Sequence, residues 1–256
     1  MKIHFLGTCS GTEPMPGIHH CSLIMEVNGI LYWFDAGENC AHAAYTSGLD
    51  IMKTKALFVS HPHIDHIGGL PNLLFCLEKL TLFDRVLADH NRLQIYFPDL
   101  ALFEAVKAIS DFKNRIVLQT HHLFDGVIFE DENIKVTAAH NLHLGIPNDG
   151  EDWRSYSFLI ETDGKRVIFS GDVKQPEDLD AIPINGADIL IMETGHHKPV
   201  DVCNYALTRN VKNLRLNHHG RIILNDRPAA EALAAQYSGG GRMSVKICYD
   251  GMVETF

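Results

Sequence analysis

Residues 61–66 read His61-Pro62-His63-Ile64-Asp65-His66, which places three imidazoles and a carboxylate within six residues. The segment before it, 55–60, is apolar, β-branched and aromatic, a pattern typical of a buried strand. The segment after it, 67–75, predicts a turn that enters a helix. The cluster is therefore expected on a loop at the carboxyl end of a strand, where α/β proteins commonly hold their chemistry.

Composition points to a globular domain in a reducing compartment. The chain has 256 residues, of which 46% are hydrophobic and 21% charged, so one domain over 1–256 can bury a sizeable core. The six cysteines are dispersed without a C-x-x-C pair, which argues against a disulfide framework or a cysteine zinc site and favours the cytoplasm. Residues 1–7 predict a first strand rather than a signal peptide, and no apolar run is long enough to span a bilayer.

The charge balance argues against a general nucleic-acid binder. The formal net charge is −10, and no run is rich in lysine and arginine, whereas a protein that grips a long polyanion usually has a basic surface. Histidine is unusually frequent, with 16 residues. Because neutral imidazole is the commonest metal-binding side chain, this excess favours a metal site.

Strands and helices are interspersed along both halves of the chain. Turn pairs Asn28-Gly29 and Asp163-Gly164 predict two hairpins, and further turns are expected at Asp125-Gly126 and 238–241. Strands are predicted at 2–7, 22–27, 31–35, 55–60, 93–98, 155–162, 165–170, 188–192, 213–216 and 243–249, with short strands between 115 and 139. Helices are predicted at 38–49, 71–80, 99–111, 199–209 and 228–237. This order predicts an α/β (α+β) fold, a four-layer αββα sandwich in one domain.

Ligand-capable side chains recur directly after apolar strands. One such histidine is more often packed or exposed than bound to metal, but several coincidences are hard to explain by packing alone. A dinuclear hydrolytic site needs about six to seven protein ligands and a bridging water or hydroxide. The chain offers enough candidates: Asp35, His61, His63, Asp65, His66, His140, His143, Asp172, His218 and His219.

The same set resembles the five motifs of the metallo-β-lactamase superfamily over nearly the whole chain. Within it, the greatest similarity is to the ribonuclease Z branch, carried by residues 5–14, 33–38 and 66–74. Ribonuclease Z carries a tRNA-clamping arm, rich in glycine, proline and basic residues, between the third and fourth motifs. Here only 28 residues separate His143 from Asp172, and they predict a tight hairpin, so the resemblance implies the fold without that arm.

The resemblance also implies a role for each candidate. His61, His63 and His143 would hold one divalent ion, while Asp65, His66 and His218 would hold a second, with Asp172 bridging both. Asp65 would also hold and orient a metal-bridging hydroxide, and Asp35 would orient the first loop by hydrogen bonding. The donor types suit zinc, with manganese and iron as alternatives.

Two ligand assignments and three helper residues stay open. His143 is preferred to His140 because it lies nearer the following strand, and His218 is preferred to His219 because one residue separates it from the preceding strand. In the segment 193–197, His196 is a candidate proton donor and Glu193 a weaker one, while His197 has no assigned role.

These features predict a metal-dependent hydrolase, a phosphodiesterase for a small molecule or a short single-stranded nucleic acid. The alternatives are a lactonase or thioesterase that attacks a carbonyl ester, and a binding module that has lost its metal. Di-iron redox chemistry ranks below these, because related enzymes place a carboxylate where His63 stands and carry a flavin domain. Family members commonly dimerise, so the resemblance implies a homodimer; the physiological substrate stays open.

Overall fold

The computed structural model describes residues 1–12 and 15–256. Glu13 and Pro14, which belong to the first motif segment, lie outside the described residues. Strands form two seven-stranded sheets, and the first has the order β14-β1-β2-β3-β4-β5-β6. Its members are β1 (Lys2–Gly7), β2 (Ser22–Val27), β3 (Ile30–Phe34), β4 (Thr54–Phe58), β5 (Arg92–Phe97), β6 (Val117–His122) and β14 (Val253–Thr255).

The second sheet has the order β13-β12-β11-β10-β9-β8-β7. Both sheets are mixed, since β3 to β6 are parallel in the first and β10 to β13 are parallel in the second. The second sheet consists of β7 (Gly126–Glu130), β8 (Lys135–His140), β9 (Tyr156–Thr162), β10 (Lys165–Phe169), β11 (Ile189–Thr194), β12 (Asn213–His219) and β13 (Ser244–Ile247).

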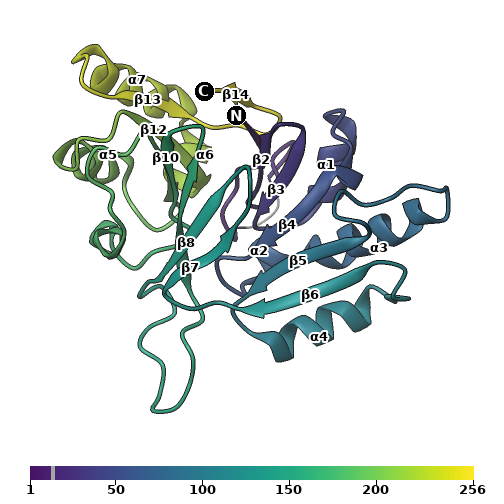
Figure 1. The fold of residues 1–256 in the computed structure, drawn as a ribbon. Coiled ribbons are helices and arrows are strands. Elements are labelled where there is room, and N and C mark those ends of the chain that lie inside the picture. The colour runs from purple at the N-terminus through teal and green to yellow at the C-terminus, as the bar shows by residue number, and fades with distance from the viewer. Residues whose placement is uncertain (13–14) are drawn as a thin grey trace.

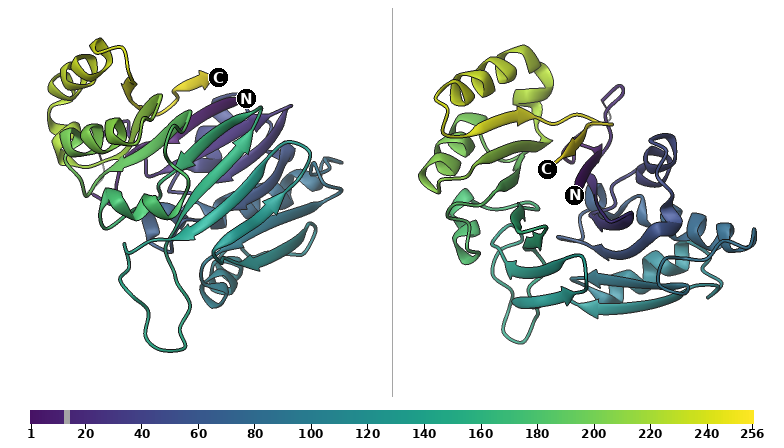
Figure 2. Two further views of the ribbon diagram at one scale, coloured as in Figure 1. Left: turned by 60° about the vertical axis from the view of Figure 1, so that its left-hand side comes forward. Right: turned by 45° about the horizontal axis from the view of Figure 1, so that its top comes forward.

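Helices cover the outer face of each sheet, which completes the predicted αββα sandwich (Figures 1 and 2). Helices α1, α3 and α4 share a hydrophobic cluster with the first sheet, whereas α5 and α7 share one with the second. The helical elements are α1 (Cys40–Thr46), α2 (Ile64–Ile67), α3 (Leu70–Thr81), α4 (Leu100–Ile109), α5 (Pro199–Thr208), α6 (Arg221–Asn225), α7 (Arg227–Gly239) and the short 3-10 helices η1 (Ile51–Lys53) and η2 (Pro176–Ala181).

Strand β3 shows how the sequence produces these layers. Tyr32 and Phe34 point into the core between the sheets, while Leu31 and Trp33 pack under the helices of the first sheet. Successive side chains of a strand point to opposite faces, so a strand buried on both faces reads as a continuous apolar run. Among the described residues, no helix is long and apolar enough to cross a membrane.

Both predicted hairpins are confirmed. β2 pairs with β3 around Asn28 and Gly29, whose φ angles are 51° and 77°, and β9 pairs with β10 around Asp163 and Gly164, at 50° and 70°. Two consecutive residues with positive φ give the turn whose twist matches the flanking strands. Asparagine, aspartate and glycine are the residues that adopt this backbone at low cost.

Several boundaries differ from the sequence prediction. The strand expected at 213–216 runs on to His219, because β11 extends far enough to pair with it, with a bulge at His218. Helix α7 continues through Gly239, into the turn expected at 238–241, and Gly126 begins β7 rather than lying in a turn. Helix α6 and strand β14 were not predicted, since elements this short show no usable periodicity.

The connection between His143 and Asp172 has two parts. The hairpin β9–β10 is present as predicted, but residues 141–155 before it form a loop that projects from the body of the protein (Figure 1). The prediction of a tight hairpin alone was therefore incomplete. Glycines and polar residues within 145–151 give this segment neither strand nor helix periodicity.

Candidate metal centre

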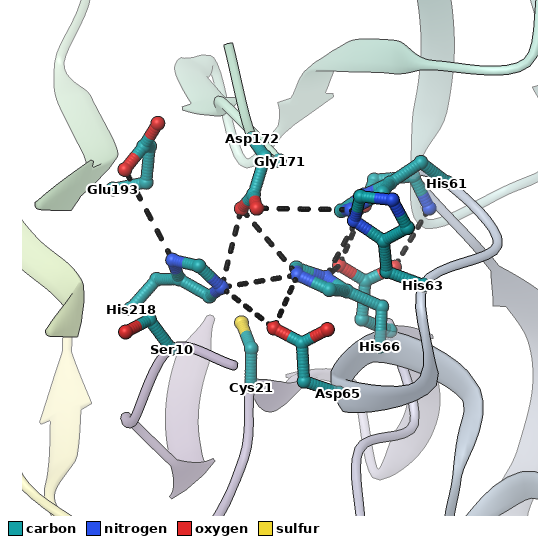
Figure 3. A network of polar contacts seen from close by, with 12 residues as sticks. Ser10, Cys21, His61, His63, Asp65, His66, Gly171, Asp172, Glu193 and His218 are labelled. Atoms are coloured by element: carbon teal, nitrogen blue, oxygen red, sulfur yellow. Dashed lines mark hydrogen bonds and ion pairs between the residues drawn. The ribbon is translucent and has the colours of Figure 1, made fainter. Parts of the chain in front are cut away.

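The predicted ligands meet where parallel strands of both sheets end, and Figure 3 shows the labelled side chains of 61–66, Asp172 and His218 pointing toward one another. β4 leads into the segment 61–66, and β10 leads into Asp172. His143 lies in the loop after β8, and His218 lies near the end of β12. Parallel strands place their carboxyl ends at a common edge, so the topology brings these distant segments together.

Asp35 fixes the loop that carries the first four candidates. Its side chain is fully buried, and Oδ1 accepts the backbone N–H of Ser60 at 2.7 Å. Oδ2 accepts the Ser60 hydroxyl at 2.7 Å and the His66 Nδ1–H at 2.6 Å. Because a carboxylate oxygen accepts hydrogen bonds, His66 donates its Nδ1–H to Asp35, which leaves Nε2 facing the cluster.

Three histidines form the first group of potential ligands: His61, His63 and His143. His61 Nε2 lies 3.1 Å from His63 Nδ1, and His143 Nε2 lies 3.4 Å from the same nitrogen. The three rings are in mutual contact, with centroids 4.6 to 5.1 Å apart. Their nitrogens therefore converge on one point.

The second group joins Asp65, His66, Asp172 and His218, all of which are buried. His218 Nε2 lies 3.1 Å from His66 Nε2 and 3.2 Å from Asp65 Oδ2. His218 adopts a left-handed backbone conformation, with φ at 49°, at the bulge in β12. The bulge turns the imidazole toward the edge of the sheet instead of into one of its faces.

Asp172 lies between the two groups and presents one oxygen to each. Oδ2 is 3.7 Å from the Nε2 atoms of both His61 and His143, while Oδ1 is 3.4 Å from His66 Nε2 and 3.3 Å from His218 Nε2. The carboxylate is buried, and Oδ1 makes no hydrogen bond within the described part of the chain. Asp172 therefore faces both groups of potential ligands, one with each carboxylate oxygen.

The donor set fits divalent metal ions. Two nitrogens bound tetrahedrally to one zinc ion, each at about 2.0–2.1 Å, lie roughly 3.3 Å apart. The nitrogens of the first group are separated by 3.1 and 3.4 Å, and those of His66 and His218 by 3.1 Å. Buried polar atoms are normally satisfied by hydrogen bonds, so converging lone pairs and an unpaired Asp172 oxygen indicate a cation site.

Electrostatics of the cluster favour positive charge between its carboxylates. Burial lowers the pKa of His61 well below its ordinary value, and the neighbouring His66 lowers it further. Burial also opposes a charge on His66, but Asp172 and Asp35 raise its pKa well above the ordinary value. For Asp172, burial is outweighed by His218, His66 and His61, which hold its pKa well below the usual range.

The alternative histidines lie outside both groups. His140 Nδ1 is 2.6 Å from Asp125, and its ring stacks on Trp153 with centroids 3.9 Å apart. His219 is buried against Thr194 and the Cys248 carbonyl, and burial lowers its pKa to about 4. The structure therefore brings together the preferred members of both pairs, His143 and His218.

Glu193 and His196 form a pair at the rim of the cluster. Glu193 is buried and accepts the backbone N–H of His196 at 2.9 Å and its Nδ1–H at 3.0 Å. The hydrogen bond to Glu193 raises the pKa of His196 to about 8. His197 Nε2 lies 3.3 Å from the same carboxylate and 3.1 Å from the Val173 carbonyl, and His197 belongs to neither ligand group. Glu193 therefore contacts both His196 and His197, whereas the sequence indicated only a weak role for it.

Asp178 is a residue that the sequence analysis missed. Its Oδ2 accepts the backbone N–H of Leu142 at 3.1 Å and that of Lys174 at 3.0 Å. These amides lie beside His143 and Asp172, so one carboxylate oxygen ties together two segments that carry candidate ligands. Asp178 lies in η2, which does not come directly after a strand and carries no motif, so no sequence signal pointed to it.

The chain is similar to several known proteins. Residues 1–200 match the family described as anti-Pycsar protein Apyc1. The chain belongs to this family. The range matched to the Apyc1 family contains the segment 61–66, His143, Asp172 and Glu193, and it ends before His218.

Matches to ribonuclease Z extend beyond the range of the Apyc1 family. The chain is 28% identical to ribonuclease Z of Picrophilus torridus over 272 residues, covering 85% of each protein. It is 26% identical to ribonuclease Z of Shouchella clausii, covering 92% of each. The short form of human tRNase Z has the same fold, with a TM-score of 0.75, 21% identity and coverage of 100% of this chain and 99% of that one. The chain is a ribonuclease Z-like member of the metallo-β-lactamase superfamily and a metal-dependent hydrolase.

Proposed function

We propose that this protein is a dinuclear metal-dependent phosphodiesterase that acts on a small or short single-stranded phosphodiester. Asp172 carries the proposal, since its two oxygens face two separate groups of potential ligands. A metal-dependent phosphodiesterase or nuclease is also the activity class of the relatives named ribonuclease Z. The number of ions and the preference for a small substrate are the new parts of this proposal.

Each metal would have its own protein ligands. His61, His63 and His143 would hold one ion, Asp65, His66 and His218 the other, and Asp172 would be shared. Imidazole and carboxylate donors suit zinc, with manganese and iron as alternatives. Two such ions would polarise the phosphoryl oxygen and lower the pKa of a water molecule.

The chain's own residues would manage the protons. Asp65 would hold and orient the attacking water, because its Oδ2 lies 3.2 Å from His218 Nε2 and 3.5 Å from His66 Nε2, and the proton that this water loses would pass to solvent. His196 would donate a proton to the departing oxygen, held in place by Glu193. A bond then forms between the water oxygen and phosphorus, and the bond from phosphorus to the leaving oxygen breaks with its electron pair.

The choice of a small substrate depends on charge. The net charge is −10, so the surface as a whole repels a long polyanion. Two divalent ions less two carboxylates and one hydroxide leave the centre itself slightly positive, which suits an anionic ester. A homodimer in the cytoplasm, with 1–256 as one domain, completes the proposal, and all six cysteines are free as a reducing compartment requires.

The test combines metal analysis with a generic substrate. Elemental analysis of the purified protein should give about two divalent metals per chain, and hydrolysis of bis(4-nitrophenyl) phosphate should stop on chelation and return with zinc or manganese. His140→Ala serves as a control because His140 lies outside the cluster. Bound metal with cleavage of a lactone or thioester but not of the phosphodiester would shift the activity to carbonyl esters. Protein that binds no divalent metal would be a binding module.

A further inference from the structure

Three buried polar side chains lie across neighbouring strands that lead to the candidate ligands of the second sheet. Ser157 lies in β9, while Asn141 and Ser170 come directly after β8 and β10, the two neighbours of β9 in the sheet. All three residues are buried, with no more than 2% of any of them exposed. Burying an amide or a hydroxyl costs free energy unless it is hydrogen-bonded, so their partners decide what these side chains do.

The two serines interrupt an apolar layer. Leu159 in β9 and Ile168 in β10 belong to the hydrophobic cluster under the helices of the second sheet. Residues two apart in a strand point to the same face, so Ser157 and Ser170 stand where further apolar side chains would continue that packing. Hydroxyl groups replace them at the end of each strand that is nearer the candidate metal centre.

Asn141 holds the backbone that carries His143. Its Oδ1 accepts the backbone N–H of His143 at 3.1 Å and the hydroxyl of Ser155 at 2.7 Å. Its own backbone N–H donates to the Ser155 carbonyl at 2.9 Å, which closes the base of the loop 141–155. The remaining part of the side chain, Nδ2, donates to Ser157 Oγ at 3.1 Å. Asn141 therefore connects the segment of His143 to the adjacent strand.

The two serines extend this network to two further segments. The Ser157 hydroxyl donates to the Ser170 carbonyl at 2.6 Å, two residues before Asp172. The Ser170 hydroxyl accepts the backbone N–H of Glu193 at 3.1 Å. One chain of buried hydrogen bonds therefore joins the segments that carry His143, Asp172 and Glu193.

This network acts at a different place from Asp178. Asp178 is only partly buried and accepts the amides of Leu142 and Lys174, which lie beside the candidate ligands. The buried network instead holds the amide of His143 itself. A hydrogen bond lost inside the protein leaves its partner unsatisfied, so the loss of a link here displaces the backbone more than the loss of one at the surface.

We propose that Asn141, Ser157 and Ser170 form one positioning network that fixes His143 relative to Asp172. This inference rests on the proposed dinuclear centre, in which these two ligands share one ion. Ligand distances in a metal site lie within about 0.2 Å of their ideal values, so a small shift of either segment weakens binding. The three residues do not bind the ion; they act through the backbone of the segments that carry its ligands.

Ser157→Ala tests the central link, because it removes one hydroxyl with little change in volume. Chelator competition on the metal-loaded protein should show affinity about tenfold lower for the ion held by His143. Thr162→Val is the matched control: Thr162 is buried in the same strand, and its hydroxyl makes no hydrogen bond within residues 1–12 and 15–256. This control should leave metal affinity unchanged.

The visible spectrum of the cobalt-substituted protein separates positioning from a general loss of stability. It reports the arrangement of ligands around the ion, so it should change in Ser157→Ala and stay the same in Thr162→Val. Asn141→Ala should weaken the same ion at least as much. The loss in the double variant of Asn141 and Ser157 should be smaller than the product of the two single losses, because both act through one network.

Failure of the inference and failure of its premise give different results. Two bound metals with unchanged affinity and cobalt spectrum in both Ser157→Ala and Asn141→Ala would exclude the network as a positioning device and leave the dinuclear centre intact. Losses that multiply in the double variant would show that the two residues act separately. Fewer than two metals in the unsubstituted protein would remove the premise. Ser170→Ala repeats the test at another link if Ser157→Ala does not fold.

Discussion

The two halves of the candidate metal centre are constructed differently. The first half is the contiguous segment 61–66, whose loop is held by hydrogen bonds to the fully buried Asp35. The second half consists of His143, Asp172 and His218, which come from three separate segments of the other sheet. Local sequence places the side chains of the first half, whereas only the packing of distant segments places those of the second half.

The anchors of the two halves differ in the same way. Asp35 makes three hydrogen bonds, one of them directly to the ligand candidate His66. Asp178 makes two, both to backbone amides beside His143 and Asp172, and it is only partly buried. The first half should therefore depend on its anchor for folding, and the second mainly for the fine position of its ligands.

The largest expected effect follows from removing a ligand of the first half. His63→Ala should release one metal and lower kcat/KM for bis(4-nitrophenyl) phosphate about a thousandfold or more, because its Nδ1 lies between His61 and His143. His63 is exposed, so the melting temperature of the metal-free protein should hardly change. Asp172→Ala should lower the affinity for both metals, because Asp172 presents one oxygen to each ligand group. If His63→Ala retained two metals per chain and full turnover, the dinuclear proposal would be wrong.

Asp35→Ala should disrupt both folding and metal binding. It leaves the Ser60 amide and the His66 ring without their partner, so the free energy of unfolding should fall by about 3–5 kcal/mol, measured by urea denaturation. Metal affinity should fall about 10- to 100-fold as well. Asp35→Asn should lie between the two, because asparagine tolerates the φ of 59° and keeps one acceptor. A fully stable Asp35→Ala variant would contradict the assigned role of this anchor.

Asp178→Ala should weaken metal binding about tenfold with little loss of stability, since it frees two loop amides without unpacking the core. The decisive comparison is Asp178→Asn. Both hydrogen bonds end on the same oxygen, and a single amide oxygen can accept both, so this variant should retain nearly normal metal affinity in a chelator competition assay. If Asn were as damaging as Ala, the charge of Asp178 rather than its geometry would matter.

His140→Ala should have the smallest effect. Its ring contacts Asp125 and Trp153 but none of the ligand groups, so kcat/KM should stay within about threefold of the original value. His143→Ala should cost about a hundredfold in the same assay, because it removes a nitrogen of the first group. Parallel kinetics of the two variants provide the measurement, and the reverse order would exchange the two histidines in the ligand set.

Much of the fold could be predicted from the sequence, because it depends on residues that are close together in the chain. The hairpins at Asn28 and Asp163 follow from turn residues that accept positive φ, and the continuous apolar run of β3 follows from burial on both faces. By contrast, β14 is three residues long and exists because β1 offers it an edge. The full length of β12 likewise depends on its neighbour β11.

The αββα layers and the segment 61–66 could be predicted from the sequence alone, because they depend on periodicity and on residues close together in the chain, while the superfamily was predicted from the resemblance of its motifs. Tertiary structure alone decided that His143 rather than His140 faces His63, and that His218 rather than His219 faces Asp65. Each choice depends on a backbone feature without a local sequence pattern: the loop amides held by Asp178, and the bulge in β12. Contacts between distant segments fix such features, so they can be assigned only after the two sheets have packed together.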